Sequence, residues 1–599
     1  MNTPVTLADW RGAYAAGAQP ATLLGTLQAR LAPDDPAWIS RLDAAGLATE
    51  LARLDTLNPA HAPLWGIPFT VKDNIDAAGW ATTAACPAFA HTADADATVV
   101  ARLRAAGAVL VGKTNLDQFA TGLVGTRSPY GEVPNTFDPA YVSGGSSSGS
   151  ASVVARGLVP FALGTDTAGS GRVPAGFNHL VGLKPTPHRI GMQGVVPACR
   201  TLDVVSVFAL TLSDAAEVAA IIDGPDAGSP LPPPVLQPAW LPDRPRIGIP
   251  DAPILDAALG YPAAWESALT RAQTLGAELV PVDFAPLFAV ASLLYDGPWV
   301  AERYAAIREV IERQPEALDP VVREVILQAR CFDAAQVFEG RYQLETLARA
   351  VAPLWEGLDA LLVPTAPTHP SRAEVAAEPI ARNSALGRYT NFVNLLGWSA
   401  LALPSSFTTA GLPFGITLIG PSGADAALTQ WGQHWEAARL AEPGAFLGAR
   451  LRPARAEDGV LRRCLNAAPT LELAVVGAHL QGLPLHYQLT ERGCRLRDRT
   501  CTAPAYRLHA LPGTTPPKPG LARVATGETG HAIEVEVYEM PLDQVGSFLA
   551  LIPPPLGLGS VELQGGRWVK GFICEGAALA GAPDISTHGG WCAYLASLS

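Results

Sequence analysis

The sequence predicts an α/β fold, in which a mixed β-sheet core is flanked by helices, with a smaller β-rich α+β domain after it. Three observations carry this prediction. Short β-branched runs alternate with helical patterns between residues 66 and 210, which is typical of an α/β core. Hydrophobic residues make up 48% of the 599 residues, enough for more than one large core. After residue 470, strand-like segments separated by Gly and Pro turns replace the helical patterns.

The elements of the first domain are predicted in chain order. Residues 1–55 are rich in Ala and Leu with charges at helical spacing, which predicts two or three helices. Helices are also expected at 96–106, 151–158 and across 262–358, and the proline-rich stretch 226–245 is expected to cross the surface. Strands are expected at 69–71, 108–111, 161–163, 204–208, 246–249, 360–363 and 414–418.

The chain is expected to divide into two domains. The first covers 1–445, an arginine-rich stretch at 446–469 is interpreted as a linker, and the second domain covers 470–599. Strands in the second domain are expected at 471–476, 532–538 and 561–563.

Composition excludes several classes of function. The formal net charge of -13 disfavours a nucleic-acid partner, because phosphate backbones are bound by basic faces. Eight cysteines without a Cys-x-x-Cys pair indicate neither a zinc site nor a disulfide scaffold, and fit a reducing cytoplasm. The N-terminal segment has neither a basic region nor a long apolar run, so we expect no signal peptide, no membrane partner and a cytoplasmic location.

Two motifs imitate other enzymes. Residues 107–114 match the phosphate-loop pattern, but the residues between the two glycines read as a strand and not as a flexible cradle of amides. Residues 145–149 match the nucleophile elbow of α/β-hydrolases, which would make Ser147 the nucleophile. A loop and not a strong apolar strand precedes this motif, so its context is wrong for an elbow.

Three further segments carry groups suited to catalysis. An apolar strand, 66–71, ends at Lys72; a run of small residues, 143–150, contains Ser146; and Ser170 lies in a Gly/Ala-rich turn, 164–175, whose amides meet little steric obstruction. Each segment alone has an ordinary explanation, namely a solvated lysine, a flexible linker or a tight turn.

Together the three segments resemble the signature of the amidase signature enzymes, and the resemblance covers residues from about 25 to 440. It implies a Ser-Ser-Lys triad in which Ser170 is the nucleophile, Ser146 the bridging serine in a cis peptide, and Lys72 the terminal base. The oxyanion hole implied by the resemblance consists of the amides of Thr167, Ala168, Gly169 and Ser170. Asp166 and Arg172 are implied to hold the loop.

The triad imposes one condition on Lys72. At an ordinary pKa of ~10.4, fewer than about one lysine in a thousand is neutral at pH 7, so the amine could not accept a proton. Burial must therefore lower its pKa by several units, and the apolar flank 67–71 is suited to bury it.

Two features resemble allophanate hydrolases in particular. Tyr295 and Arg303 have the spacing of the substrate-binding pair of those enzymes, and a guanidinium suits the carboxylate at the far end of allophanate. Gly122 is a further, weaker candidate for substrate contact. Segments 475–485 and 584–591 resemble the C-terminal domain of allophanate hydrolases, which implies a fold related to γ-glutamyl cyclotransferases and decarboxylation of N-carboxycarbamate with His479 as acid or base.

The sequence thus predicts an amidohydrolase acting on linear amides that converts allophanate to two ammonia and two carbon dioxide. No metal or organic cofactor is expected, nor biotin, because no Ala-Met-Lys-Met-like segment occurs. The resemblance suggests a homodimer, coupled to a urea carboxylase or to a triazine-pathway hydrolase. Three alternatives stay open: a glutamine-hydrolysing tRNA amidotransferase subunit, an α/β-hydrolase esterase using Ser147, and a binding protein without activity.

Overall fold

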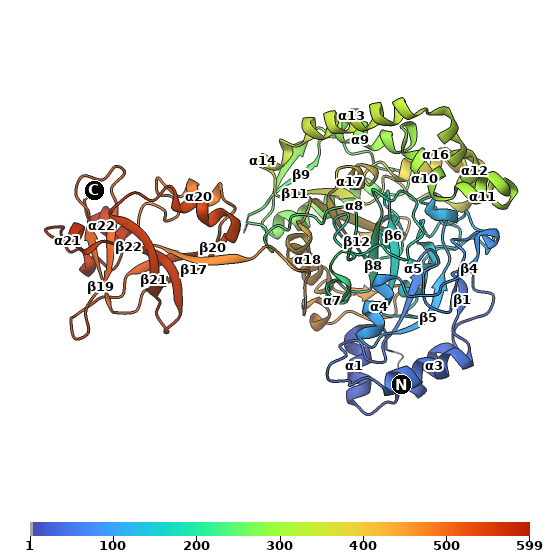
Figure 1. The fold of residues 1–599 in the computed structure, drawn as a ribbon, viewed down its shortest axis with the longest axis horizontal. Coiled ribbons are helices and arrows are strands. Elements are labelled where there is room, and N and C mark those ends of the chain that lie inside the picture. Colours follow the sequence, from blue (N-terminus) through green and yellow to red (C-terminus); the bar gives the residue numbers. More distant parts are fainter. Residues whose placement is uncertain (1–3, 243, 599) are drawn as a thin grey trace. The chain divides into compact units, whose positions relative to one another are not determined.

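A computed structural model describes residues 4–242 and 244–598, and the chain divides into two compact units, 1–467 and 468–599 (Figure 1). Residues 1–3, 243 and 599 lie outside the described residues. They belong to the predicted N-terminal helical part, the proline-rich crossing and the end of the second domain.

The first unit is built on one mixed sheet, in the strand order β1-β5-β2-β6-β8-β7-β12-β13-β11-β9-β10. Strand β2 lies between β5 and β6 and is parallel to both, whereas β6 and β8 are antiparallel. The predicted α/β class with a mixed sheet is therefore confirmed. The strands are β1 (Trp38–Arg41), β2 (Pro68–Lys72), β5 (Val109–Thr114), β6 (Phe161–Asp166), β7 (Val181–Lys184), β8 (Val204–Ala209), β9 (Arg246–Pro250), β10 (Glu278–Val282), β11 (Ala360–Pro364), β12 (Ser399–Phe407) and β13 (Pro413–Gly420).

Helices enclose this sheet. Helices α5 (Ser148–Ala155), α7 (Leu212–Ile222), α8 (Tyr261–Thr274) and α18 (Asp425–Leu440) pack directly on its strands. Figure 1 shows a further layer of helices on one side of the unit, which includes α9 (Ala285–Asp296), α10 (Trp299–Ala306), α12 (Pro320–Leu327) and α13 (Ala334–Val351). Within the described ranges, no helix combines the length and the apolar character needed to cross a membrane.

The N-terminal part contains the predicted helices, α1 (Leu7–Ala15), α2 (Pro20–Gln28) and α3 (Ala44–Asp55). Helix α1 begins with a capping box, in which Thr6 and Asp9 satisfy each other's backbone amides. Strand β1 was not predicted from the sequence. It pairs antiparallel with β5 and forms one edge of the sheet.

The phosphate-loop lookalike is a buried strand, as its residues predict. All of β5 is buried, and the Nζ atom of Lys113 lies 3.1 Å from Asp73 Oδ1. The same amine donates to Thr82 Oγ1 at 2.6 Å and to the Ala81 carbonyl at 2.8 Å. Lys113 thus serves as the partner of a buried carboxylate.

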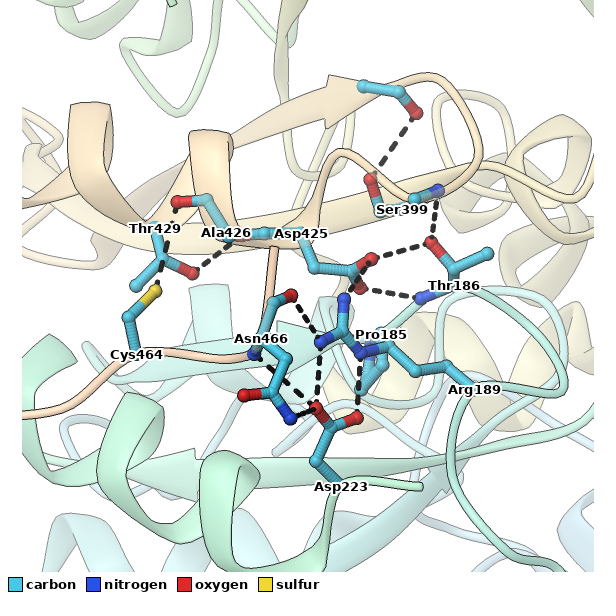
Figure 2. Close-up of polar contacts among 12 residues, drawn as sticks. Pro185, Thr186, Arg189, Asp223, Ser399, Asp425, Ala426, Thr429, Cys464 and Asn466 are labelled. Atoms are coloured by element: carbon cyan, nitrogen blue, oxygen red, sulfur yellow. Dashed lines mark hydrogen bonds and ion pairs between the residues drawn. The ribbon is translucent and has the colours of Figure 1, made fainter. Parts of the chain in front are cut away.

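The predicted linker, 446–469, is folded against the first unit as far as residue 467. Strands β14 (Phe446–Leu447) and β15 (Arg452–Pro453) pair with each other. Further along, the Asn466 carbonyl accepts a 2.7 Å hydrogen bond from Arg189, whose guanidinium also pairs with Asp223 and Asp425 (Figure 2). The predicted linker is therefore part of the first unit up to residue 467.

The second unit has its own sheet and core. Its strand order is β17-β20-β16-β22-β21, beside a two-stranded hairpin, β18 with β19. The buried side chains of this unit, such as Leu473, Val537 and Phe548, form a cluster of their own. The predicted β-rich second domain is confirmed. Its strands are β16 (Thr470–Val475), β17 (Arg495–Cys501), β18 (Tyr506–Ala510), β19 (Pro519–Arg523), β20 (Glu534–Pro541), β21 (Leu556–Glu562) and β22 (Trp568–Cys574).

Candidate active site

Lys72 is the last residue of β2 and is fully buried. Because β2 and β6 are parallel neighbours, their C-terminal ends meet at one edge of the sheet. The Nζ atom of Lys72 lies 2.7 Å from Ser146 Oγ and 2.8 Å from Thr165 Oγ1 of β6. The structure therefore places the predicted base in contact with the predicted bridging serine.

The environment of Lys72 weakens its basicity. Burial disfavours the ammonium and lowers the pKa of Lys72 from 10.5 to about 7. Asp117, Asp203 and Asp166 oppose this shift through their charges, and Arg303 adds to it. The net pKa makes a large fraction of neutral amine available near pH 7, which is the condition that a lysine base must meet.

Ser146 precedes α5 and is fully buried, and its peptide bond to Gly145 is cis, as the resemblance implies. Gly145 has no room for a side chain, because a Cβ atom there would lie 2.1 Å from Asp117 Oδ2. The neighbouring Ser147 is also buried, and its hydroxyl donates to the Thr165 carbonyl at 3.2 Å. This bond occupies the Ser147 proton and disfavours Ser147 as an esterase nucleophile.

Ser170 lies in the loop between β6 and α6 (Val173–Phe177). The Asp166 carboxylate accepts the amides of Gly169 at 2.8 Å and Gly171 at 3.0 Å. Arg172 completes the loop with two parallel bonds of 2.9 and 3.0 Å to the same carboxylate. Burial opposes ionisation of Asp166, but Arg172 and the backbone donors outweigh it and lower the pKa of that carboxyl. The two predicted scaffold residues thus hold the turn around Ser170.

One amide of the predicted oxyanion hole has a hydrogen-bond partner within the loop. The Gly169 amide already donates to Asp166, so it is not free for an oxyanion in this structure. The amides of Thr167, Ala168 and Ser170 donate to no other group in the described part of the chain. The Thr167 side chain is fixed separately, because its hydroxyl donates to Asp203. Three amides around the predicted nucleophile are therefore available for a developing negative charge.

The predicted proton relay is half-formed. Lys72 contacts Ser146, but residues 4–242 and 244–598 contain no hydrogen bond between Ser146 and Ser170. Catalytic hydrogen bonds are often long or misaligned in an empty site and shorten when substrate binds. We therefore expect this second contact to form in the substrate complex.

Arg303 lies on α10 near this site and is 2% exposed. Its Nη1 atom donates to Thr121 Oγ1 at 3.1 Å, and its guanidinium carbon is 5.5 Å from the ring centre of Tyr295 on α9. Gly122 follows Thr121, and a Cβ atom there would lie 2.5 Å from Asp117 Oδ2. The structure thus brings Arg303 together with both Tyr295 and the 120–122 loop.

The guanidinium of Arg303 lacks an anionic partner among the described residues. No carboxylate lies within salt-bridge distance of it, and its Nε atom has no hydrogen-bond acceptor. An unpaired buried charge is costly unless a ligand compensates it. The arrangement is suited to a substrate that carries a carboxylate, the group that a guanidinium binds with two parallel bonds.

His479 belongs to the second unit. Its ring stacks on Phe572 with centroids 4.9 Å apart, and its Nε2 atom lies 2.9 Å from Gln488 Oε1. Burial lowers the pKa of His479 below its ordinary value. A small cavity of about 30 Å³ beside it is also lined by Lys518 and Pro519.

Sequence reasoning missed Thr165, Asp117 and Asp203, all buried near Lys72. Thr165 could have been found, because it lies at the end of the strand that runs parallel to the one carrying Lys72.

A cavity of about 720 Å³ is lined by Leu202, Trp299 and Asn394, which border the site, but not by the triad residues. In the described part of the chain, no cluster of His, Cys, Asp and Glu side chains could hold a metal ion.

Comparisons with known proteins cover both units. Residues 37–429 match the family model for amidases, and residues 471–596 match the model for the allophanate hydrolase C-terminal domain. Urea amidolyase of Lachancea kluyveri is 46% identical over 588 residues, which are 96% of this chain and 32% of that protein. The chain thus spans about a third of the curated relatives that it matches along its length.

A solved structure matches over its whole length. Kluyveromyces lactis allophanate hydrolase is 44% identical, with a TM-score of 0.84 and coverage of 99% of each chain. A glutamyl-tRNA(Gln) amidotransferase protein of Symbiobacterium thermophilum is 36% identical over 403 residues, which are 61% of this chain and 82% of that protein.

Two buried lysines in neighbouring strands should respond to substitution in opposite directions. Lys72→Met removes an amine whose ammonium is disfavoured by burial, so we expect the folded state to become more stable, by up to a few kcal/mol at pH 6. Its folded pKa lies below its unfolded one, so this gain should shrink as the pH rises from about 7 to 10.5. Urea unfolding at pH 6 and pH 9 measures both effects.

Lys113→Met is the matched control. It leaves the buried Asp73 carboxylate without its cation, so we expect a loss of about 3–5 kcal/mol. Equal destabilisation by both substitutions would contradict this account of Lys72.

Proposed function

Because the chain belongs to the amidase family and continues into an allophanate hydrolase C-terminal domain, we propose that it hydrolyses allophanate with the triad Ser170, Ser146 and Lys72. The observation that carries this proposal is the 2.7 Å contact between Ser146 Oγ and a lysine amine whose pKa is lowered to about 7. A neutral amine at that position can accept a proton from a serine. The unpaired guanidinium of Arg303 then binds the carboxylate end of the substrate.

Acylation begins with proton transfer. Neutral Lys72 accepts the proton of Ser146, Ser146 accepts that of Ser170, and Ser170 Oγ attacks the terminal amide carbon of allophanate. The oxyanion that forms is stabilised by the three free amides of the loop. When the tetrahedral intermediate collapses, the C–N bond breaks and ammonia leaves with the proton returned through Ser146. The product of this half-reaction is an acyl ester on Ser170.

Deacylation reverses the roles. The triad takes a proton from a water molecule, the hydroxide attacks the ester carbon, and the proton returns to Ser170 as the C–O bond breaks. The released product is N-carboxycarbamate. Arg303 holds the carboxylate of the substrate in both half-reactions, because that group is distant from the bond that breaks.

A second step is proposed for the second unit. N-carboxycarbamate loses one carbon dioxide when a proton is delivered to its nitrogen, and the resulting carbamate decomposes to ammonia and a second carbon dioxide. His479, which lines a small cavity together with Lys518, is proposed as the acid or base of this step. The urea amidolyase relatives support a further proposal, that the allophanate comes from a urea carboxylase.

The alternative substrate is glutamine. The amidotransferase protein of Symbiobacterium thermophilum matches 61% of this chain, whereas the allophanate hydrolase of Kluyveromyces lactis matches 99%. A glutamine side chain would place a chain of methylenes, and not a nearby carboxylate, next to the amide that is attacked. The buried guanidinium of Arg303 therefore favours allophanate.

Ser170→Ala should lower kcat for ammonia release by at least about a thousandfold, because it removes the nucleophile. Ser147→Ala is the matched control on the neighbouring motif and should cost less than about tenfold. A fluorophosphonate should label Ser170, as mapped by peptide mass spectrometry. An adduct on Ser147 would refute the assignment of Ser170 as the nucleophile.

In the unmodified enzyme, kcat/KM should rise with pH through about 7, because Lys72 is protonated below that value.

Arg303→Met should lower kcat/KM for allophanate by about a hundredfold or more, because the substrate carboxylate loses its partner. Biuret has the same shape with a neutral amide in place of the carboxylate, so its hydrolysis should change much less. Arg349→Met, at an exposed position of α13, is the control and should leave both rates unchanged. Equal losses for allophanate and biuret would show that Arg303 does not recognise the carboxylate.

His479→Ala should separate the two ammonia molecules. We expect the first to be released at the normal rate and the second to lag, so the early ratio of ammonia to allophanate consumed falls from about two toward one. His588→Ala, at an exposed position of the same unit, is the control and should keep the ratio near two. An unchanged ratio in His479→Ala would remove His479 from the reaction.

A further inference from the structure

We propose that Asp117 is a positioning residue that ties the Lys72–Ser146 pair to the arginine that holds the substrate carboxylate. The proposal rests on the function proposed above and adds to it a residue that acts through its neighbours. Asp117 follows β5 in the chain and is fully buried, and it has no cationic partner among the described residues. Its structural role must therefore come from the neutral groups around it.

One connection runs from Asp117 to the bridging serine. The Asp117 amide donates to the Ser146 carbonyl at 3.1 Å. The Asp117 side chain packs against Gly145, because its Oδ2 atom lies only 2.1 Å from the position that a Cβ atom of residue 145 would take. Asp117 thus contacts both sides of the peptide that presents the Ser146 hydroxyl to Lys72.

The second connection runs to the substrate loop, 118–127. Asp117 Oδ2 accepts the amides of Val124 at 3.2 Å and Gly125 at 3.0 Å, and Oδ1 accepts the amide of Arg127 at 3.0 Å. Three donors of this kind stabilise an ionised carboxylate in a buried site. They also fold the loop back on its own beginning, so its shape depends on that carboxylate.

The same loop contacts Arg303 through Thr121. Thr121 accepts the 3.1 Å hydrogen bond from Arg303 Nη1, and its carbonyl accepts a 3.0 Å bond from Arg127 Nη1. Gly122 lies against Asp117, with 2.5 Å between its ideal Cβ position and Oδ2. A displacement of the Asp117 carboxylate would therefore move Thr121 and, with it, the guanidinium.

The charge of Asp117 adds a third effect that a purely structural residue would not have. Lys72 faces the carboxylates of Asp117, Asp203 and Asp166, which raise its pKa, and the Arg303 guanidinium, which lowers it, while burial sets the overall direction. Of the three carboxylates, Asp117 has the largest influence. Its removal should lower the pKa of Lys72 further, so the neutral base would persist to lower pH.

Asp117→Asn, in the full-length protein, is the first test. We expect kcat/KM for allophanate to fall by about tenfold to a hundredfold, because an amide cannot accept all three backbone donors. The acidic limb of the pH profile of kcat/KM should move to lower pH by at least about half a unit. The preference for allophanate over biuret should also fall, because Arg303 is displaced.

Gly122→Ala is the second variant, and it keeps the charge. Its added methyl should displace the carboxylate, lower the allophanate to biuret ratio by several-fold, and leave the pH midpoint in place. This variant also tests the proposal if Asp117→Asn does not fold.

Loss of activity in Asp117→Asn with an unchanged pH midpoint and an unchanged substrate ratio would overturn the proposal and leave Asp117 as a structural residue. An unchanged substrate ratio in Gly122→Ala would also overturn it. Failure of the unmodified protein to hydrolyse allophanate would instead remove the proposed function, so the two failures are distinguishable.

Discussion

The site depends on one constraint: the Lys72 amine is buried, and no carboxylate among the described residues contacts it directly. The neighbouring strand shows the alternative. Lys113 pairs in register with Val71, so the side chains of Lys72 and Lys113 point to opposite faces of the sheet. Lys113 meets the Asp73 carboxylate at 3.1 Å, whereas Lys72 meets two hydroxyls. The same residue type thus forms an ion pair on one face and a weakened base on the other.

The surrounding charges are arranged so that Lys72 stays unpaired. Asp166 is neutralised by the two parallel bonds of Arg172 and is used to fold the turn that carries Ser170. Asp203 is held by the Thr167 hydroxyl and by backbone amides, and burial raises its pKa to about 6. Each carboxylate near the amine is therefore satisfied by another group. That arrangement leaves the serine as the closest acceptor and donor for Lys72.

Arg303 is the counterpart of Lys72 in this arrangement. Both side chains are buried, and neither contacts an anion in the part of the chain that the structure describes. A guanidinium keeps its proton under all ordinary conditions, whereas an amine does not. One becomes a neutral base and the other remains a permanent positive charge. In the function proposed above, the amine transfers protons and the guanidinium binds an anionic ligand. The loop between β5 and α5 contacts the guanidinium through Thr121.

The sequence by itself determined the α/β class and the β-rich second unit, because apolar periodicity encodes them. Local motifs also selected the candidate triad residues, whose roles remain a proposal. Within the large sheet it missed β1, β7, β10 and β12, and in the second unit it missed β17, β18, β19 and β22. Strand β12 is rich in Ala and Ser, and such strands form because neighbouring strands bury them. Only the tertiary structure decided that the Gly169 amide is already used by Asp166, that Thr165 contacts Lys72, and that the charge of Asp117 lies near enough to influence this amine. Lys72 and Thr165 are 93 residues apart, so no local pattern could predict their contact. The bond between Gly169 and Asp166 spans only three residues, but it depends on how the loop folds around the carboxylate.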